Sequence, residues 1–358
     1  MTRKIGPITG PGTSAEQFGV GGTDLGIPVK LPNGSTAFVF GDTFEQFTVG
    51  GPGWRSPVLL RSDVDLPRKV EFSSAAGGRY AKQLIDYQHS NPEFSTVLPC
   101  DGVTIGSRTL LWVMFTQGLG NERYCEIIES SDNGETWTRN GRRWSSAAFR
   151  GQRVMMTWDR GRDGWVYAIS TGGLARNKNA LLWRVRETDI LDPAKWEAWC
   201  WIDNRWQWKV NPADHEPGDI FPGGARLGEL CLRWVQGNWV LSYFDAAAYA
   251  IRVKVAASPT ANWHTAPTYT VVKGQGLPWD TNVLSQLYGG YIVPGSKLDD
   301  PEGVHLIVSQ WNTSTNWPYQ ASQWSTTIRS VAPKIDDPTP PASGTEWDPI
   351  LAEILGTS

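Results

Sequence analysis

Residues 22–44, GTDLGIPVKLPNGSTAFVFGDTF, contain the pattern that decides the fold. Thr23 to Val29 and Ala37 to Phe44 are two apolar, strand-like runs. The turn between them, Pro32-Asn33-Gly34-Ser35, contains Asn-Gly, one of the strongest hairpin signals. The stretch therefore predicts a β-hairpin whose second strand ends in Gly-Asp-Thr-Phe.

The same succession of apolar strand, short turn and second strand recurs four more times. The later copies join Cys100–Ile105 to Thr109–Thr116, Arg153–Trp158 to Trp165–Ser170, Glu229–Val235 to Trp239–Phe244, and Tyr288–Val293 to Val304–Trp311. Equivalent positions in the five copies, Phe38, Leu111, Val166, Val240 and Leu306, lie 73, 55, 74 and 66 residues apart. A period of this length indicates a repeated unit larger than a single hairpin.

Further strand-like runs follow the hairpins, for example Tyr124–Ser130 with Thr136–Arg139, and Ala180–Val185 with Trp196–Ile202. Helical periodicity is almost absent before residue 345. The chain is therefore predicted to be all-β, a five-bladed β-propeller of four-stranded units. A β-sandwich is the alternative, but its strands would be more evenly spaced.

Residues 130–137, SSDNGETW, fit the Asp-box pattern S-x-D-x-G-x-T-W that occurs on propeller hairpins. Its predicted role is structural, because Asp132 can cap the turn, Gly134 supplies a backbone shape that other residues avoid, and Trp137 anchors the loop.

Composition narrows the class of protein. The chain has 358 residues, 33 Lys and Arg against 36 Asp and Glu, and a net charge of -3, which argues against a nucleic-acid partner. Its 20 Trp offer rigid faces that pack sheets or stack on sugar rings. The start of the chain lacks a continuous apolar segment, and nowhere do about 18 apolar residues follow one another, so we expect neither a signal peptide nor a membrane span.

The composition changes after residue 330. We divide the chain into a catalytic propeller domain, 1–330, and a linker with a short amphipathic tail, 331–358. Four prolines stiffen the linker, and Trp347 to Leu355 could form a two-turn helix. Two interpretations stay open: a frayed tail that docks on the propeller, or a segment that binds a partner or self-associates.

Several carboxylates lie where the first strand of a predicted hairpin begins or where the strand that pairs with it ends. In a propeller the first strand is the innermost strand of its blade. Asp24 opens the first inner strand and Asp42 closes its hairpin partner. The turn at Asn33-Gly34 places Asp24 roughly opposite Thr43, so both aspartates should lie at one rim, one residue off register.

Two carboxylates around a pocket suit glycoside hydrolysis, in which one is protonated and donates a proton while the other is ionised. Asp101 and Glu229, at the starts of later units, are candidate auxiliary carboxylates that tune pKa values or hold substrate. The structural alternative for any single aspartate is a turn cap.

Aromatic and polar side chains at the corresponding rims are candidates for substrate binding: Thr43, Trp54, Arg55, His89, Gln117, Tyr288, Gln310 and Trp311. Any one Trp is equally suited to packing, and His89 to a polar loop. No serine-hydrolase, zincin or nucleotide-binding motif occurs in the sequence. No metal ligands and no cofactor are predicted, although a structural Ca²⁺ ion in the channel stays open.

Six motifs carry a resemblance to a known family: Gly22–Gly26, Phe40–Phe44, Trp54–Ser62, Gly228–Leu230, Leu287–Tyr291 and Ser309–Asn312. Over roughly residues 10–330 the chain resembles a propeller family long catalogued as a domain of unknown function and since assigned to endo-D-arabinofuranase glycoside hydrolases. These enzymes cut the D-arabinan of mycobacterial and corynebacterial arabinogalactan and lipoarabinomannan. The resemblance implies that Asp24 and Asp42 are the catalytic pair.

The resemblance also implies a polysaccharide partner and a location outside the cell. Either the protein is extracellular, or it is virion-associated, as a phage tail depolymerase of arabinan-coated hosts. Related propeller hydrolases mostly invert, which predicts carboxyl groups about 6.5–9.5 Å apart.

Two other functions remain possible. One is a non-catalytic carbohydrate-binding propeller, such as a receptor-binding module. The other is a sialidase-like enzyme, suggested by the Asp box. That enzyme would need three convergent arginines, and the rim motifs supply only Arg55.

Overall fold

A computed structural model describes residues 2–210 and 215–335 of the chain. The predicted helix Trp347–Leu355, and the linker from residue 336 onward, lie outside the described residues.

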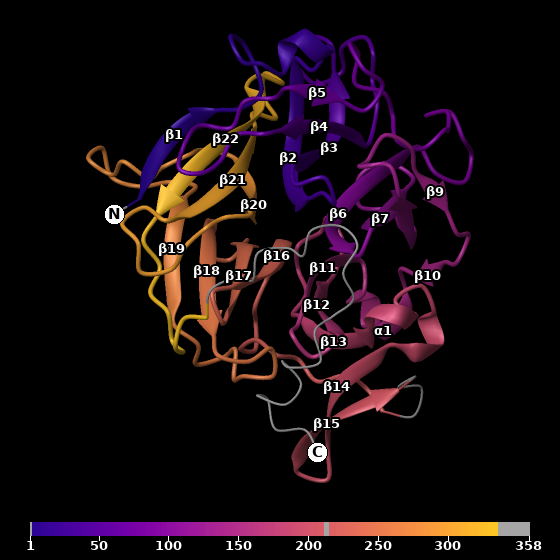
Figure 1. The fold of residues 1–358 in the computed structure, drawn as a ribbon, viewed down its shortest axis with the longest axis vertical. Helices are drawn as coiled ribbons and strands as arrows, with labels where there is room; N and C mark the ends of the chain where they lie inside the picture. Colours follow the sequence, from indigo (N-terminus) through magenta and orange to yellow (C-terminus); the bar gives the residue numbers. More distant parts are fainter. Residues whose placement is uncertain (1, 211–214, 336–358) are drawn as a thin grey trace.

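Five antiparallel sheets surround a central axis, which confirms the predicted five-bladed β-propeller (Figure 1). The first blade contains β2 (Gly22–Lys30), β3 (Thr36–Phe44), β4 (Val58–Ser62) and β5 (Ser74–Ala75). The second contains β6 (Thr96–Ile105), β7 (Arg108–Thr116), β8 (Glu122–Ser130), β9 (Thr138–Arg139) and β10 (Trp144–Ser145).

The third blade contains β11 (Met155–Arg160), β12 (Trp165–Thr171), β13 (Leu181–Arg186), β14 (Glu197–Ile202) and β15 (Arg205–Val210). The fourth contains β16 (Leu227–Val235), β17 (Asn238–Asp245), β18 (Ala250–Ala256) and β19 (Thr268–Lys273). The fifth contains β20 (Leu287–Ile292), β21 (Val304–Trp311), β22 (Tyr319–Thr326) and β1 (Arg3–Pro7). The short helices are α1 (Ala148–Gly151), η1 (Glu16–Phe18), η2 (Glu187–Asp189) and η3 (Pro193–Lys195).

The N-terminal strand closes the ring. β1 pairs antiparallel with β22, so the first strand of the chain is the outermost strand of the last blade. These hydrogen bonds join the N-terminal strand to the last blade, and the chain then continues from β1 into the first blade. The sequence did not predict this strand, because RKIGP has only one large apolar residue and both Gly and Pro.

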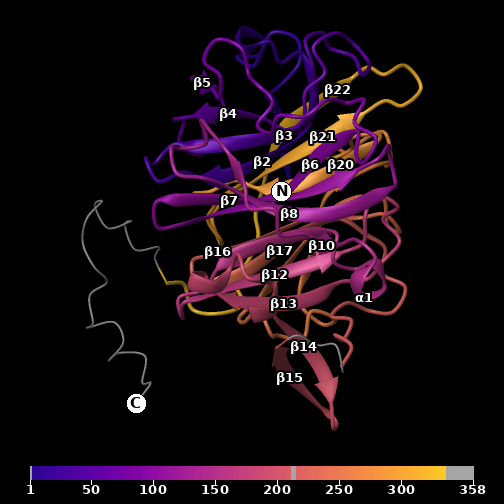
Figure 2. The ribbon, with the colours of Figure 1, turned by 90° about the vertical axis from the view of Figure 1, so that its right-hand side faces the viewer.

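The third blade is longer than predicted. β15 extends the sheet beyond β14, and this hairpin projects from the body of the propeller (Figure 2). Trp199, Trp206 and Trp208 stabilise it, with the rings of Trp199 and Trp206 stacked 5.9 Å apart.

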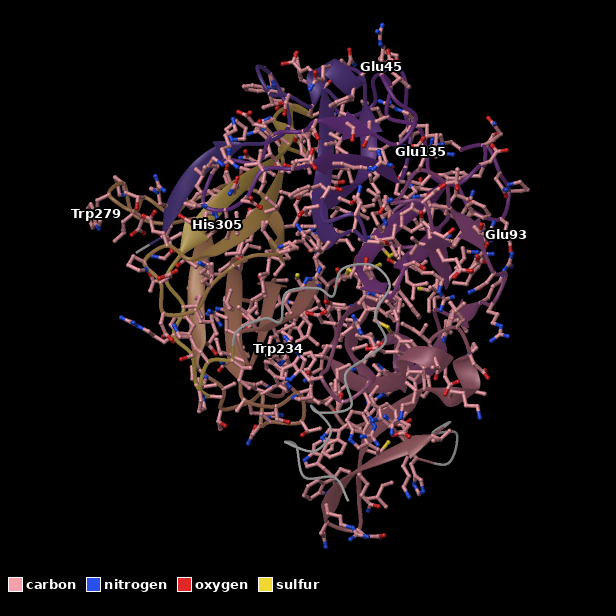
Figure 3. All side chains as sticks on the ribbon, viewed as in Figure 1. Glu45, Glu93, Glu135, Trp234, Trp279 and His305 are labelled. Carbon is pink, nitrogen blue, oxygen red and sulfur yellow. The ribbon has the colours of Figure 1, made fainter. Side chains whose placement is uncertain are left out.

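The core lies between neighbouring blades. Five buried tryptophans, Trp112, Trp144, Trp158, Trp183 and Trp196, fill the space between the second and third blades. Charged side chains such as Glu45, Glu93 and Glu135 lie at the periphery (Figure 3). In the part of the chain that the structure describes, no helix is long and apolar enough to cross a membrane.

The Asp box forms the turn between β8 and β9. Partial burial alone would raise the pKa of Asp132, but hydrogen bonds from Thr136, Ser130 and the Glu135 backbone bring that pKa down to about 2. Here the motif is a structural element of the second blade.

Candidate active site

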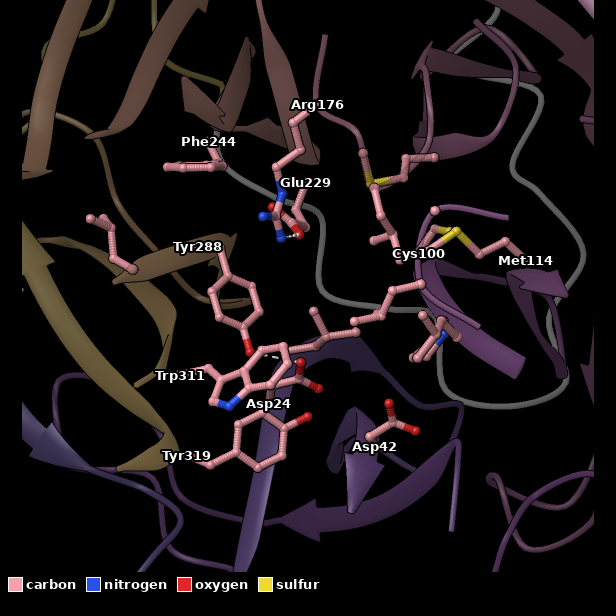
Figure 4. A pocket seen from close by; sticks show the side chains of 18 of the residues that line it. Asp24, Asp42, Cys100, Met114, Arg176, Glu229, Phe244, Tyr288, Trp311 and Tyr319 are labelled. Atoms are coloured by element: carbon pink, nitrogen blue, oxygen red, sulfur yellow. Dashed lines mark hydrogen bonds and ion pairs between the residues drawn. The ribbon is translucent and has the colours of Figure 1, made fainter. Parts of the chain in front are cut away.

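A cavity of about 830 Å³ opens at the end of the propeller where the inner strands begin and the second strands end. All five blades contribute residues to its wall. Asp24, Asp42 and Glu229 lie on this wall together with Tyr288, Trp311 and Tyr319 (Figure 4).

A β-bulge places the two aspartates next to each other. Thr23 pairs with Thr43 and Leu25 pairs with Phe40, so the two residues Gly41 and Asp42 lie opposite the single residue Asp24. The register prediction was therefore wrong by one residue, since Thr23 and not Asp24 faces Thr43. The turn centre alone could not reveal the extra residue of the bulge.

Gly41 makes room for the first carboxylate. A Cβ atom at this position would collide with Oδ1 of Asp24 and approach Cδ1 of Leu25 to 3.1 Å. The Gly-Asp sequence therefore has a steric purpose: the glycine lets Asp24 lie against the backbone of β3.

Asp24 holds a proton near neutral pH. Its Oδ2 accepts a hydrogen bond of 2.8 Å from the hydroxyl of Tyr288, and its buried Oδ1 has no partner among the described residues. Burial, together with the negative charges of Asp42 and Glu229, raises the pKa of Asp24 to about 7, although the hydroxyls of Tyr288 and Tyr319 oppose the rise.

Asp42 is held by Trp54. The indole Nε1 donates a hydrogen bond of 2.6 Å to Oδ1 of Asp42. Burial raises the pKa of Asp42, whereas this hydrogen bond and the neighbouring His89 lower it. Because only Asp24 combines burial with two carboxylate neighbours, the two aspartates have different environments.

His89 packs against the indole ring of Trp54 and fixes its position, although His89 itself does not line the cavity. The imidazole stacks on the indole with ring centres 3.5 Å apart and planes 6° from parallel. Nδ1 lies 2.7 Å from the carbonyl oxygen of Ser95, and Nε2 lies 3.1 Å from that of Trp54. Both ring nitrogens therefore face backbone carbonyl oxygens, which fix the orientation of the imidazole.

Glu229 is paired with a cation. Nη2 of Arg176 donates a hydrogen bond of 2.6 Å to Oε1 of Glu229, and the Arg176 guanidinium also lies 5.3 Å from the ring centres of Phe244 and Tyr288. A carboxylate paired in this way is suited to accept hydrogen bonds from a hydroxyl group and to position Arg176.

Asp101 lies away from the cavity, in the channel at the centre of the propeller. It is fully buried, and Arg233 donates to both of its oxygens at 2.7 and 2.8 Å. Thr157 also donates to it, and Arg233 reaches the carbonyl oxygen of Pro28 at 3.2 Å. This cluster joins four blades, so the structure gives Asp101 a place in the scaffold.

The other predicted binding residues fall into two groups. Trp54, Tyr288 and Trp311 line the cavity. Five do not line it: Thr43, Arg55, His89, Gln117 and Gln310. Arg55 illustrates the second group, because it donates to the backbone carbonyls of Gly53, Ala81 and Gly19 and stacks on Tyr80.

Tyr319 and Arg176 are among the polar residues of the site that were not predicted from the sequence. Tyr319 begins β22 and Arg176 lies on the connection after β12, so both come directly after the predicted hairpins. Antiparallel strands alternate in direction, and the start of a third strand returns to the same rim. That rule would have drawn attention to Tyr319.

No three His, Cys, Asp or Glu side chains within residues 2–210 and 215–335 come together in a way that could hold a metal ion. A cofactor-independent site stays a prediction.

Comparison with known proteins gives related sequences. The family described as "Domain of unknown function (DUF4185)" matches residues 9–325. An uncharacterized 35.9 kDa protein of Mycolicibacterium smegmatis is 30% identical over 344 residues, which cover 90% of this chain and 97% of that protein. Notoamide biosynthesis cluster protein J of an Aspergillus species is 27% identical over 325 residues, covering 85% of this chain and 83% of that protein.

Comparison with solved structures gives the same fold. The GH43_1 enzyme from Xanthomonas citri superposes with a TM-score of 0.54 and 12% identity, over 95% of this chain and 98% of that enzyme. At this identity the likeness shows a shared propeller fold.

Proposed function

Because this chain belongs to the DUF4185 family and brings two unlike aspartates together in one cavity, we propose that it is a glycoside hydrolase that cleaves α-D-arabinofuranosyl linkages in D-arabinan. The observation that carries this proposal is the pair itself. Asp24 has a pKa of about 7, and Asp42 next to it is stabilised by an indole N–H.

The different environments of Asp24 and Asp42 assign the role of general acid to one and of general base to the other. Asp24 is the general acid, because a carboxyl group with a pKa near 7 still carries its proton at neutral pH and can give it to the leaving oxygen. Asp42 is the ionised partner: burial raises its pKa, but the hydrogen bond from Trp54 and the neighbouring His89 both favour its charged form. It activates the attacking water in the direct displacement that we favour.

The substrate follows from the motifs and the aromatic residues. The resemblance of the Gly-Asp-Thr-Phe and Trp-Arg-Ser motifs to D-arabinan hydrolases, and the match to a mycobacterial relative, support an arabinofuranosyl substrate. Trp311, which is partly exposed on the cavity wall, offers a face on which a sugar ring can stack, and the Arg176–Glu229 pair offers groups for its hydroxyls.

D-arabinan is a cell-wall polymer, so the proposal includes work outside the cytoplasm, by an extracellular enzyme or by a phage tail depolymerase.

The arginine pattern gives no support to a sialidase. Among the described residues that line the cavity, Arg176 is the sole arginine, and it is already paired with Glu229. Arg55, the arginine that the motifs offered, donates to backbone carbonyls instead.

The experiment compares the wild type with the Asp24→Asn/Asp42→Asn double variant on purified mycobacterial arabinogalactan, with chromatography of the released sugars. We expect short arabino-oligosaccharides from the wild type alone. No release by either protein, with polysaccharide binding retained by both, would instead establish a binding module.

A further inference from the structure

The β14–β15 hairpin carries four tryptophans on one of its faces. Trp199 pairs with Trp208, and Trp201 pairs with Trp206. Residues two apart on a strand, and residues directly opposite each other on paired strands, point to the same side of a sheet, so the four indoles share one face. None of these four side chains is buried, and none lines the cavity of the candidate active site.

Three of these tryptophans hold the hairpin to the third blade. The rings of Trp199 and Trp206 stack with centres 5.9 Å apart, and those of Trp199 and Trp208 lie 4.7 Å apart. The guanidinium group of Arg184, on β13, lies 4.4 Å from the ring centre of Trp208. Gly218 lies against Trp206, and a Cβ atom on this glycine would collide with the indole. These contacts give Trp199, Trp206 and Trp208 a structural role.

Trp201 has no comparable role, because 54% of it is exposed. Its indole makes an edge-to-face contact with that of Trp206, with ring centres 5.5 Å apart and planes at 71°. This contact orients the ring and leaves most of its surface in water. Exposed aromatic surface that is already oriented gains free energy when a ligand covers it, and little conformational entropy is lost. Trp201 is therefore suited to binding rather than to packing.

The surroundings of Trp201 suit a sugar. The turn that follows contains Asp203, Asn204 and Arg205, which are all exposed. An indole can stack on the C–H face of a sugar ring, and a neighbouring carboxylate, amide and guanidinium group can bind its hydroxyls. An apolar protein surface would remove water from these three polar groups without replacing its hydrogen bonds. A second copy of the chain is disfavoured as well, since charged residues such as Lys209 on the edge strand β15 oppose edge-to-edge pairing.

The turn of this hairpin lies at the end of the propeller where the cavity opens. Cys200, the neighbour of Trp201, pairs with Pro217 in an isolated bridge. The carbonyl oxygen of Pro217 accepts a hydrogen bond of 3.3 Å from Nη2 of Arg150. Arg150 precedes the inner strand β11, whose first residue, Met155, lines the cavity. A polymer that leaves the cavity over the third blade can therefore reach Trp201 on the projecting hairpin (Figure 2).

We propose that Trp201 and the turn 203–205 form a second sugar-binding site, outside the cavity, which holds the arabinan chain while the cavity cleaves it. The inference rests on the proposed function for the identity of the sugar, and it adds a site that the catalytic pair does not need. Two linked binding sites on one polymer raise its apparent affinity, because the second contact forms at a high effective concentration. The site should therefore matter for the polymer and not for a short oligosaccharide that fills only the cavity.

The first experiment measures binding of purified mycobacterial arabinogalactan and of a D-arabinofuranosyl trisaccharide. The Asp42→Asn variant serves as the parent, so that nothing is cleaved. We expect Trp201→Ala to raise the Kd for the polymer at least about fivefold and to leave the Kd for the trisaccharide unchanged. Trp201→Tyr keeps an aromatic face and should restore most of the polymer affinity. An unchanged polymer Kd in Trp201→Ala, or equal losses for polymer and trisaccharide, would overturn the inference.

Trp279→Ala is the matched control. Trp279 is 74% exposed, lies between β19 and β20 at the periphery (Figure 3), and does not line the cavity. Its removal should leave both Kd values unchanged. A loss of polymer affinity equal to that of Trp201→Ala would contradict a site on the hairpin.

Two further measurements distinguish binding of a sugar from other roles of Trp201. The unfolding midpoint of Trp201→Ala should equal that of the parent, since the other three tryptophans still hold the hairpin. A lower midpoint in both Trp201→Ala and Trp201→Tyr would show a structural role instead. In sedimentation velocity, a dimer that Trp201→Ala dissociates would assign the indole to a contact between copies and overturn the inference.

Hydrolysis by proteins that retain Asp42 separates the two proposals. We expect Trp201→Ala to raise the KM for arabinogalactan at least about fivefold at an unchanged kcat. Cleavage with the same KM as the wild type overturns this inference alone. Polymer binding that depends on Trp201, without cleavage by any of the proteins, overturns the proposed function alone. A parent that does not bind the polymer overturns both.

Discussion

Asp24 lowers the stability of the folded protein above neutral pH, and replacing it with Asn should reveal by how much. The pKa of this carboxyl group rises from 3.8 to about 7 on folding, mainly because of burial. One pKa unit corresponds to about 1.4 kcal/mol, so the ionised carboxylate costs the folded state about 4 kcal/mol.

The direction of the change in stability with pH follows from the protonation of Asp24 in the folded and the unfolded chain. Below pH 3.8 both the folded and the unfolded chain carry the proton, and Asp24 does not change stability. Between pH 3.8 and about 7 only the unfolded chain ionises, so the free energy of unfolding falls as the pH rises. Above pH 7 the full cost is present. Asn imitates the neutral carboxyl group and has no such cost.

Urea unfolding of the wild type and Asp24→Asn at pH 4.5 and pH 8.5 measures the effect. We expect the variant to be more stable than the wild type by about 1 kcal/mol at the lower pH and by up to about 4 kcal/mol at the higher pH. Asp280→Asn is a control, because hydrogen bonds from Leu277 and Lys273 lower the pKa of Asp280, so that this substitution should lower stability to a similar extent at both pH values. A stability difference between the wild type and Asp24→Asn that does not change with pH would refute the reasoning.

Three further substitutions test the rest of the site and the buried cluster of Asp101 and Arg233. Trp54→Phe removes the indole N–H from Asp42 and raises its pKa, so the acidic limb of the pH–rate profile should move to higher pH; an unmoved limb would contradict that role. Gly41→Ala should lower activity at least tenfold while the unfolding midpoint changes little, because a Cβ atom displaces the Asp24 carboxylate; normal activity would contradict the steric argument. Arg233→Met leaves a fully buried aspartate unpaired and should cost about 3–5 kcal/mol in urea unfolding; a smaller loss than about 1 kcal/mol would show that the cluster does not support the channel.

Much of the fold could be predicted because hairpins are local. The Asn33-Gly34 turn and the apolar runs on either side determine β2 and β3 within a few residues, and the other four hairpins follow in the same way. β1 could not be predicted, since its partner β22 lies more than 300 residues away and its own five residues are only weakly strand-like. The strand β15 was not predicted, because the strand-like runs assigned to this unit ended at Trp196–Ile202.

The candidate site was predictable to the extent that it lies at strand ends. Asp24 and Asp42 flank one turn, so their proximity follows from local pairing, but the bulge that aligns them does not. The ion pair between Asp101 and Arg233 joins residues 132 positions apart across the channel, and no local pattern indicates it. The same holds for Tyr288 on Asp24, which depends on how the first and last blades meet.

The most direct test of the central claim uses two α-D-arabinofuranosides that differ in the leaving group, one a nitrophenol and one an aliphatic alcohol. A nitrophenolate leaves without protonation, whereas an alkoxide needs the proton of a general acid. The account predicts that Asp24→Asn cleaves the nitrophenyl glycoside at close to the wild-type rate but loses at least about a hundredfold on the alkyl glycoside. Equal losses on both substrates, or an Asp24→Asn variant that cleaves the alkyl glycoside as fast as the wild type, would contradict the assignment of Asp24 as the acid of this site.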